Sequence, residues 1–350
     1  MNKIFDIKWE EFVEKIKDCK QKIILFGASS CADIFLNRMK TKFDVQYIVD
    51  NDVKKQGKKL FGYDIYPIDK LYDSKKEDIL VITSTWCDEI VKQLEDIDYK
   101  GTVYSYLHMQ NKAVSQQLQR ESDNIDKNID LLLDICEDEK SKNIVKTVIS
   151  NIKSGNTDYS SIYEKDQYFV KELIKITDDE VFVDGGAYDG NTVDEFIKNA
   201  SGKFKKIYAF EMDQSNFNKI SRQKYSENVC FLNYGLWDKK EKVSFVENET
   251  ASEIVDGGAK TAQCVSLDET VNEKVTFIKM DIEGAEQKAL RGSERHIVND
   301  KPKLAICLYH RVSDLWEIPF YVKKLVPEYK IYIRHHSMNR DETVMYAIPE

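Results

Sequence analysis

The sequence predicts an α/β protein with two doubly wound, mainly parallel sheets, one in each half of the chain. In both halves, short runs of aliphatic and β-branched residues alternate with segments whose apolar residues recur at helical spacing. In each half, one strand-like run ends in a glycine turn that leads into a helical pattern. A chain of 350 residues is long enough for two domains, each with its own hydrophobic core.

The first half begins with an amphipathic helix and continues as alternating strands and helices. Trp9, Phe12 and Ile16 recur at helical spacing. A predicted strand ends at Phe26, Gly27 provides a turn, and Ser29 or Ser30 is a suitable cap for the next helix. Further strands are predicted at residues 45–50, 78–84 and 102–107, with a helix at residues 86–97. This alternation is typical of a parallel sheet of the Rossmann type, and we assign the Rossmann-like domain to residues 1–108.

Residues 109–165 differ in character from the segments on either side. They are polar, contain no proline and carry apolar residues at helical spacing around Ile129 and Val148. Gly155 suits the position just after the end of a helix. We therefore predict a helical connector that packs onto one of the two domains, followed by a second domain over residues 166–350.

The most informative segment is VFVDGGAYDGNT, residues 181–192. A short apolar run ends in Asp184, glycines follow at 185, 186 and 190, and a helical pattern begins at Thr192. Glycine permits a positive φ and a close approach to a ligand, and open α/β sheets bind ligands at the carboxyl ends of their strands. The next predicted strand, residues 206–210, ends in Glu211, which is placed to accept both hydroxyls of a ribose.

Four segments resemble those of known methyltransferases. The spacing D-x-G-x-x-x-G differs from the dinucleotide pattern G-x-G-x-x-G and resembles motif I of class I S-adenosylmethionine-dependent methyltransferases. The segments YAFEMD (208–213), VTFIKMDIEGAE (275–286) and LYH (308–310) are similar to those of the FkbM family. The resemblance covers about residues 165–350. It implies the class I methyltransferase fold, S-adenosyl-L-methionine as cofactor and methyl transfer mostly to oxygen.

The end of the chain supports this fold. We expect strands and helices to alternate up to Val326, followed by two strands at residues 329–335 and 343–348 that are joined by SMNRDE. A late hairpin matches the seven-stranded methyltransferase sheet, whose last strand is antiparallel.

The resemblance assigns the cofactor to residues at the carboxyl edge of this sheet. The methionine end would lie at the glycine loop, the ribose at Glu211 and the adenine between Met212 and residues 235–238. The complete predicted cofactor set is Asp184, Gly186, Tyr188, Gly190, Thr192, Glu211, Met212, Leu236 and Asp281.

The predicted catalytic residues are His310 and Asp281, which follow neighbouring strands of the sheet. Histidine has a suitable pKa range for a general base on a hydroxyl, so we assign that role to His310, with His335 and His336 as alternatives. His108 and His296 lie away from the predicted pocket, and we expect them at the surface.

Carboxylates near Asp281 raise the question of a metal ion. Asp281, Glu283 and Glu286 could hold magnesium. However, we expect Glu283 and Glu286 in the first turn of a helix, where the helix dipole alone favours acidic residues. We therefore predict no metal site. No C-x-x-C motif or His/Cys cluster indicates a structural zinc either.

Composition narrows the function further. The net charge of −9 argues against a nucleic-acid partner. We expect no signal peptide and no membrane span. Seven cysteines without paired spacing predict reduced thiols in a cytoplasmic protein, with Cys31, Cys230 and Cys307 as core residues.

The function predicted first is S-adenosylmethionine-dependent O-methylation of a small-molecule or glycan acceptor. The acceptor hydroxyl would belong to a sugar of a surface glycan or its nucleotide-activated precursor, which implies a role in polysaccharide biosynthesis. The alternative is a nicotinamide-dependent oxidoreductase or a nucleotide-sugar binding protein. That alternative would use the first domain, where GASSCA (27–32) keeps one glycine of a dinucleotide loop and Asp50 occupies a ribose-acid position. A homo-oligomer is left open.

Overall fold

The computed structural model describes most of the chain and divides it into two compact units. The described residues are 7, 9–17, 22–29, 31–32, 35–36, 45–74, 76, 78–84, 86–107, 109, 122–248, 251–254 and 260–350. The first unit comprises residues 1–121 with two short segments, 152–155 and 248–250, and the second comprises residues 122–151, 156–247 and 251–350. Each unit is described separately below.

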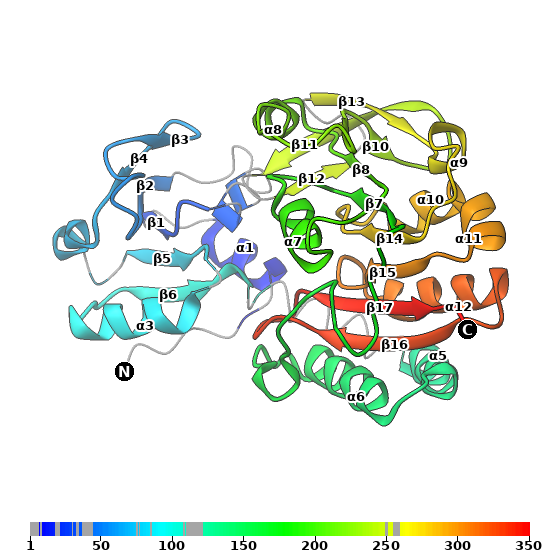
Figure 1. The fold of residues 1–350 in the computed structure, drawn as a ribbon. Coiled ribbons are helices and arrows are strands. Elements are labelled where there is room, and N and C mark those ends of the chain that lie inside the picture. Colours follow the sequence, from blue (N-terminus) through cyan, green and yellow to red (C-terminus); the bar gives the residue numbers. More distant parts are fainter. Residues whose placement is uncertain are drawn as a thin grey trace. The chain divides into compact units, whose positions relative to one another are not determined.

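The first unit contains a six-stranded sheet with the order β3-β4-β2-β1-β5-β6 (Figure 1). All neighbouring strands pair in parallel except β3, which is antiparallel to β4. The strands are β1 (Ile23–Phe26), β2 (Val45–Val49), β3 (Lys59–Leu60), β4 (Tyr63–Tyr66), β5 (Ile79–Ile82) and β6 (Thr102–Ser105). The helical elements are α1 (Trp9–Lys17), α3 (Cys87–Asp96) and the 3₁₀ helix η1 (Ile68–Asp73). The parallel sheet predicted for this half is therefore present, whereas its classification as Rossmann-like stays a prediction.

Both faces of this sheet are buried because successive side chains of a strand point to opposite sides. Ile23 and Leu25 of β1 join a hydrophobic cluster that includes Phe12 of α1. Ile24 and Phe26 join a second cluster, which contains buried side chains of α3. A run of four consecutive buried residues is what a central parallel strand requires.

The second unit is built on a seven-stranded sheet with the order β16-β17-β15-β14-β7-β8-β9 (Figure 1). The strands are β7 (Val181–Gly185), β8 (Lys206–Phe210), β9 (Val229–Leu232), β14 (Phe277–Met280), β15 (Lys303–Cys307), β16 (Lys330–His335) and β17 (Thr343–Ile348). Strand β17 runs antiparallel to both β15 and β16, while the other pairs are parallel. The predicted α/β fold class and the antiparallel last strand are confirmed.

Helices connect the strands of this sheet. They are α7 (Asn191–Asn199), α8 (Gln214–Ile220), α9 (Leu267–Thr270), α10 (Glu286–Arg291), α11 (Glu294–Asp300) and α12 (Asp314–Leu325). Within the described residues, no helix of either unit is long and apolar enough to cross a membrane. The described cysteines are free thiols. Cys307 is buried as predicted, whereas Cys31 and Cys230 are only half-buried.

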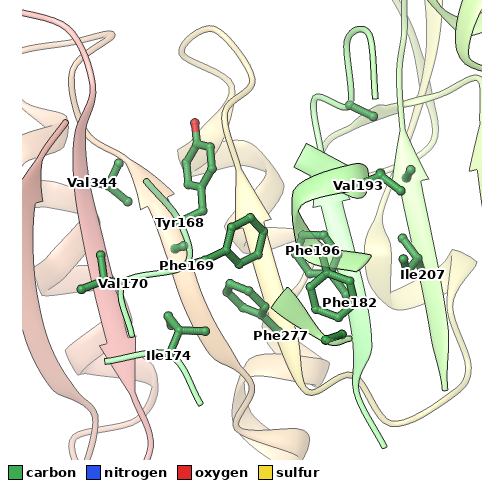
Figure 2. Packing of buried hydrophobic residues seen from close by; sticks show 14 of the residues in the cluster. Tyr168, Phe169, Val170, Ile174, Phe182, Val193, Phe196, Ile207, Phe277 and Val344 are labelled. Carbon is green, nitrogen blue, oxygen red and sulfur yellow. The ribbon is translucent and has the colours of Figure 1, made fainter. Parts of the chain in front are cut away.

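An aromatic cluster fixes the strand that leads to the glycine loop (Figure 2). The rings of Phe182 in β7 and Phe196 in α7 stack with centroids 4.4 Å apart. Phe277 of β14 lies 5.0 Å from Phe182, and Phe169 lies 6.0 Å from Phe277. These contacts join β7, β14 and the segment around Phe169 in one core, so the ends of both strands and residue 168 have fixed positions.

The expected alternation of strands and helices up to Val326 is wrong for residues 235–265. This segment forms a separate four-stranded sheet with the order β10-β13-β11-β12. Its strands are β10 (Gly235–Leu236), β11 (Glu241–Asn248), β12 (Ala251–Ile254) and β13 (Lys260–Val265). Val243 and Phe245 of β11 are buried, and the residue between them is not. This period-two pattern is the signal of a half-buried strand, and it was missed.

The described part of the connector is attached to β16. It forms α5 (Ser122–Ile135) and α6 (Glu139–Ser154). Between them, the Glu137 amide donates to the Ile331 carbonyl at 2.9 Å. The Ile333 amide donates to Ser141 Oγ at 2.8 Å, and Arg334 Nη2 donates to Asp138 Oδ2 at 2.6 Å. Residues 122–151 therefore belong to the second unit, and the predicted boundaries at 108 and 165 stay predictions.

We predict that Arg334→Met lowers the free energy of unfolding by ~2–4 kcal/mol, because the partly buried Asp138 carboxylate loses its charged partner. Urea denaturation measures this loss. Lys301→Met, which removes an exposed ion pair with Glu328, is the control and should cost less than ~1 kcal/mol. Equal losses of unfolding free energy in the two variants would contradict a stabilising role of the Asp138–Arg334 pair.

The same interaction has a defined pH dependence. Burial alone would raise the pKa of Asp138, but hydrogen bonds from Arg334 and Ser141 lower it from 3.8 to about 2. The stabilisation is therefore present above pH 3.8 and is lost as the pH falls through 2.

Candidate active site

The glycine loop follows β7 directly and leads into α7. Gly186 and Gly190 have φ values of +81° and +89°, which glycine adopts without strain. A Cβ atom at Gly186 would lie 2.0 Å from the backbone oxygen of Asp281. The loop thus passes so close to the end of β14 that only glycine fits at position 186.

A buried ion pair lies beneath this loop. Asp184 and Lys279 occupy paired positions of β7 and β14, and both side chains are almost fully buried. Lys279 Nζ lies 3.0 Å from Asp184 Oδ1 and donates to the carbonyl oxygens of Gly185 and Gly186 at 3.2 and 2.9 Å. Burial raises the pKa of Asp184. Burial works against the charge of Lys279, but Asp184 and Asp281 hold its pKa above the usual value.

The ion pair changes the role expected for Asp184. Its carboxylate has no exposed surface, so it supports the loop from below and does not line an open cofactor pocket. Lys279 was not among the predicted site residues. The available signal was a lysine inside the apolar run FIKM, because a buried charge needs a partner.

Glu211 connects the loop to the residues that follow β8. Its Oε2 accepts from the Tyr188 amide at 2.8 Å, and its Oε1 accepts from the Asp213 amide at 2.7 Å. The side chain is almost fully buried, and this burial raises its pKa to about 7. Each carboxylate oxygen retains a further lone pair that can accept a hydroxyl donor.

Apolar residues lie beside this carboxylate. Met212 Sδ lies 3.5 Å from the position that a Cβ at Gly235 would take. Leu236 Cδ1 lies 2.9 Å from the corresponding position at Gly185. The structure therefore places Leu236 next to the start of the glycine loop and Met212 next to Gly235. Thr192 is half-buried in the first turn of α7.

Asp281 lies directly after β14 and is held by two tyrosines. Tyr168 Oη donates to Asp281 Oδ2 at 2.8 Å, and Tyr309 Oη donates to Oδ1 at 2.9 Å. Burial works against its charge, but Lys279 and His310 hold the pKa of Asp281 below its usual value. Tyr168 has a φ of +64°, an uncommon value for a non-glycine residue. Neither tyrosine was predicted, because only the folded chain brings residue 168 to Asp281.

His310 lies among carboxylates. Its Nδ1 is 3.0 Å from Glu286 Oε1, and its Nε2 is 3.4 Å from Glu283 Oε2 and 3.5 Å from Asp281 Oδ1. Burial alone would lower the pKa of His310, but these carboxylates raise it to about 11. The ring is then protonated at neutral pH, whereas a general base must be neutral. The surroundings therefore disfavour the role predicted for His310.

The other histidines have structural partners. His335 bonds to Thr343 and Asn339 and stacks on Tyr159. His336 contacts the Tyr346 hydroxyl at 2.8 Å, and burial lowers its pKa to about 4. The expected surface position of His296 is wrong, because this residue is fully buried and lies 2.6 Å from Asp300. His108 lies outside the described residues.

The helix after Asp281 begins later than predicted. Helix α10 starts at Glu286, and Glu283 lies before it with a φ of +55°. Glu286 is fully buried, and its Oε1 accepts from the Ile282 amide at 2.9 Å. Glu286 therefore lies in the first helical turn as predicted, whereas the predicted helical position of Glu283 is wrong.

In the first unit, the residues proposed for a dinucleotide have partners of their own. Asp50 accepts from the amides of Ala28 and Asp52, each at 2.7 Å. Lys55 Nζ donates to the Ala28 carbonyl at 2.6 Å and lies 3.7 Å from Asp50. Ser30, which belongs to the predicted glycine turn, lies outside the described residues.

Two family models match the chain. Residues 184–337 match the methyltransferase FkbM domain, and residues 19–102 match the C2185-like N-terminal family. A search of curated proteins gives no match.

The chain was compared with solved structures. A methyltransferase FkbM from Methylobacillus flagellatus KT matches with a TM-score of 0.70 and 22% identity, over 98% of this chain and 94% of that chain. An rRNA methylase from Streptococcus thermophilus matches with a TM-score of 0.34 and 19% identity, over 52% of this chain and 93% of that chain. Fibrillarin from Aeropyrum pernix, in complex with S-adenosyl-L-methionine, matches with a TM-score of 0.33 and 14% identity, over 51% of this chain and 72% of that chain. Only the first likeness is strong enough to support the fold.

We predict that Gly186→Ala lowers the free energy of unfolding by ~3–5 kcal/mol, since it combines a left-handed φ with a contact against Asp281. Gly202→Ala is a matched control. Gly202 also has a positive φ, +74°, but its Cβ position meets no atom within 4 Å, so the cost should be ~1–2 kcal/mol. Chemical denaturation measures both values. If the two variants lose similar amounts of unfolding free energy, the glycine loop can move away from β14.

Proposed function

We propose that this chain, whose residues 184–337 match the methyltransferase FkbM domain, is an S-adenosylmethionine-dependent O-methyltransferase. The observation that carries the proposal is the fixed loop at the carboxyl ends of β7 and β8. The loop is held by Lys279 from below and by Glu211 at Tyr188. Ligands of α/β sheets bind at this edge.

The residues present fit the cofactor. Glu211 would accept the ribose hydroxyls, the backbone of residues 186–190 would face the amino-acid end, and Met212 and Leu236 would pack on the adenine. Bound S-adenosylmethionine supplies an activated methyl group on a sulfonium. The protein's contribution is to hold this group and the acceptor in line, which can provide a large part of the rate enhancement.

Asp281 is the residue best placed to orient the acceptor. Its carboxylate is ionised, and its side chain retains 22% exposure although two tyrosine hydroxyls bind it. An ionised carboxylate accepts a hydrogen bond from a hydroxyl and favours loss of its proton. Under this proposal, a hydroxyl oxygen held by Asp281 is the methylated atom.

We infer that the acceptor hydroxyl belongs to a sugar of a glycan or of its nucleotide-activated precursor. Tyr309 and Asp281, together with Gln167 and Glu342, which bond to each other, supply several polar groups near one another. Such a set suits a ligand with several hydroxyls. Mass spectrometry after incubation with S-adenosylmethionine and a panel of nucleotide sugars tests this, with one added methyl group expected. Methylation only of amine acceptors would contradict O-methylation.

We predict that Glu211→Ala weakens S-adenosylmethionine binding by ~10–100-fold, because the ribose loses two charge-assisted hydrogen bonds. Isothermal titration calorimetry measures the affinity. Asp50→Ala, which removes the corresponding acid of the first unit, is the control and should leave the affinity unchanged. Unchanged binding by Glu211→Ala would remove Glu211 from the site.

Cofactor affinity should also depend on pH. The free protein has a Glu211 pKa of about 7, and ribose hydroxyls bind the ionised form more tightly. Affinity should therefore be constant above about pH 8 and should fall by at most ~10-fold per unit as the pH decreases below 7. Calorimetry from pH 5.5 to 8.5 checks this expectation. An affinity that does not change below pH 7 would contradict it.

A further inference from the structure

We propose that Asp281, Glu286 and His310 form a binding site for one divalent cation at the carboxyl edge of the seven-stranded sheet. One oxygen of each carboxylate and one ring nitrogen lie within 4.8 Å of one another. The role of the cation in holding the acceptor rests on the proposed function, whereas cation binding itself does not.

The surroundings of His310 are the first observation. Its side chain is 9% exposed, and among the described residues neither ring nitrogen has a hydrogen bond of suitable geometry. The distances of 3.4 and 3.5 Å from Nε2 to Glu283 and Asp281 exceed those of ordinary hydrogen bonds. The ligand atoms of Asp281, Glu286 and His310, one from each residue, lie within 4.8 Å of one another, and a cation binds such ligands at roughly 2.0–2.2 Å.

Glu286 provides a second, independent observation. This side chain has no exposed surface, and its Oε1 accepts a hydrogen bond from the Ile282 amide. Within the described chain, its Oε2 is buried and has no hydrogen-bond partner. Burial of an ionised carboxylate is costly unless a charge compensates it. A cation bound by Glu286 would supply that compensation.

The balance of charge favours a divalent ion. Asp281, Glu283 and Glu286 are three acids around one histidine, and Lys279, which also acts on Asp281, is shared with Asp184. A protonated His310 alone would leave an excess of negative charge. Carboxylates suit Mg²⁺ and Mn²⁺, and imidazole suits transition metals, so Mn²⁺ fits this mixed ligand set.

A neighbouring group, Asp281 with Cys307 and Glu342, is a weaker choice. The Cys307 side chain is fully buried, with its Sγ 3.6 Å from the Tyr168 hydroxyl. Glu342 already accepts from Gln167. These partners are satisfied without a cation, in contrast to Glu286 and His310.

The position of the site indicates its role. Asp281 is both the residue that we assign to the acceptor and a ligand of the cation. A cation beside it would attract the acceptor oxygen and favour loss of the hydroxyl proton to water. It would also replace the proton on His310, so the ring would act as a ligand and not as a base.

The test is a titration of the full-length, chelator-treated protein with MnCl₂, followed by calorimetry and by the electron paramagnetic resonance signal of free Mn²⁺. We expect one saturable site in the wild-type protein. His310→Gln and Glu286→Gln should each weaken binding at least ~10-fold, the usual cost of an altered metal ligand or its support. Glu328→Gln, at an exposed ion pair with Lys301, is the matched control and should bind as wild type.

Two results would overturn the site. These are the absence of saturable Mn²⁺ binding to the wild-type protein, and wild-type affinity in both ligand variants. The titration of the wild-type protein tests whether the Mn²⁺ site exists even if a variant does not fold. A parallel titration with S-adenosylmethionine in the presence of chelator separates the two proposals. S-adenosylmethionine binding without a saturable Mn²⁺ site would support the proposed function and overturn the cation site. Saturable Mn²⁺ binding without S-adenosylmethionine binding would support the cation site and contradict the proposed function.

Discussion

The buried ion pair between Asp184 and Lys279 is the interaction on which the rest of the candidate site depends. Transfer of two charges from water into a protein interior costs several kcal/mol for each ion unless they are paired and hydrogen-bonded. Here Lys279 Nζ lies 3.0 Å from Asp184 Oδ1 and donates to two loop carbonyls. Movement of the glycine loop would remove partners from a buried ammonium group. The loop is therefore held at the edge of the sheet before any ligand binds.

In both units, the acidic residue that follows the second strand makes the same two hydrogen bonds. Asp50 bonds to the Ala28 amide in the loop after β1, and Glu211 bonds to the Tyr188 amide in the loop after β7. In each case the second oxygen accepts from the amide two residues further on. This geometry comes from the parallel sheet and does not by itself indicate a function. The second unit differs because its loop lies over a buried charge and beside a group of carboxylates.

Much of this fold was predictable because its signals are local. The buried run of β7 and the glycines at 186 and 190 are visible within a dozen residues, and the late hairpin is visible within residues 329–348. The contacts that define the site are not local. Tyr168 reaches Asp281 across 113 residues of sequence, and no spacing rule connects the two. The surroundings of His310 depend on the left-handed backbone at Glu283. We had expected a helix at that residue, and a helix would not place Glu283 in this way.

We expect Lys279 to hold the glycine loop in the form that binds S-adenosylmethionine. The direct measurement compares Lys279→Met with the double variant Asp184→Leu/Lys279→Met in stability and in S-adenosylmethionine affinity. The single variant should lose ~3–5 kcal/mol of stability, because it leaves a buried carboxylate unpaired, and the double variant should recover most of that loss. Affinity should remain at least ~10-fold weaker than wild type in both variants, since the carbonyls of Gly185 and Gly186 have lost a charged donor. A stable double variant that binds S-adenosylmethionine as tightly as the wild-type protein would contradict the account.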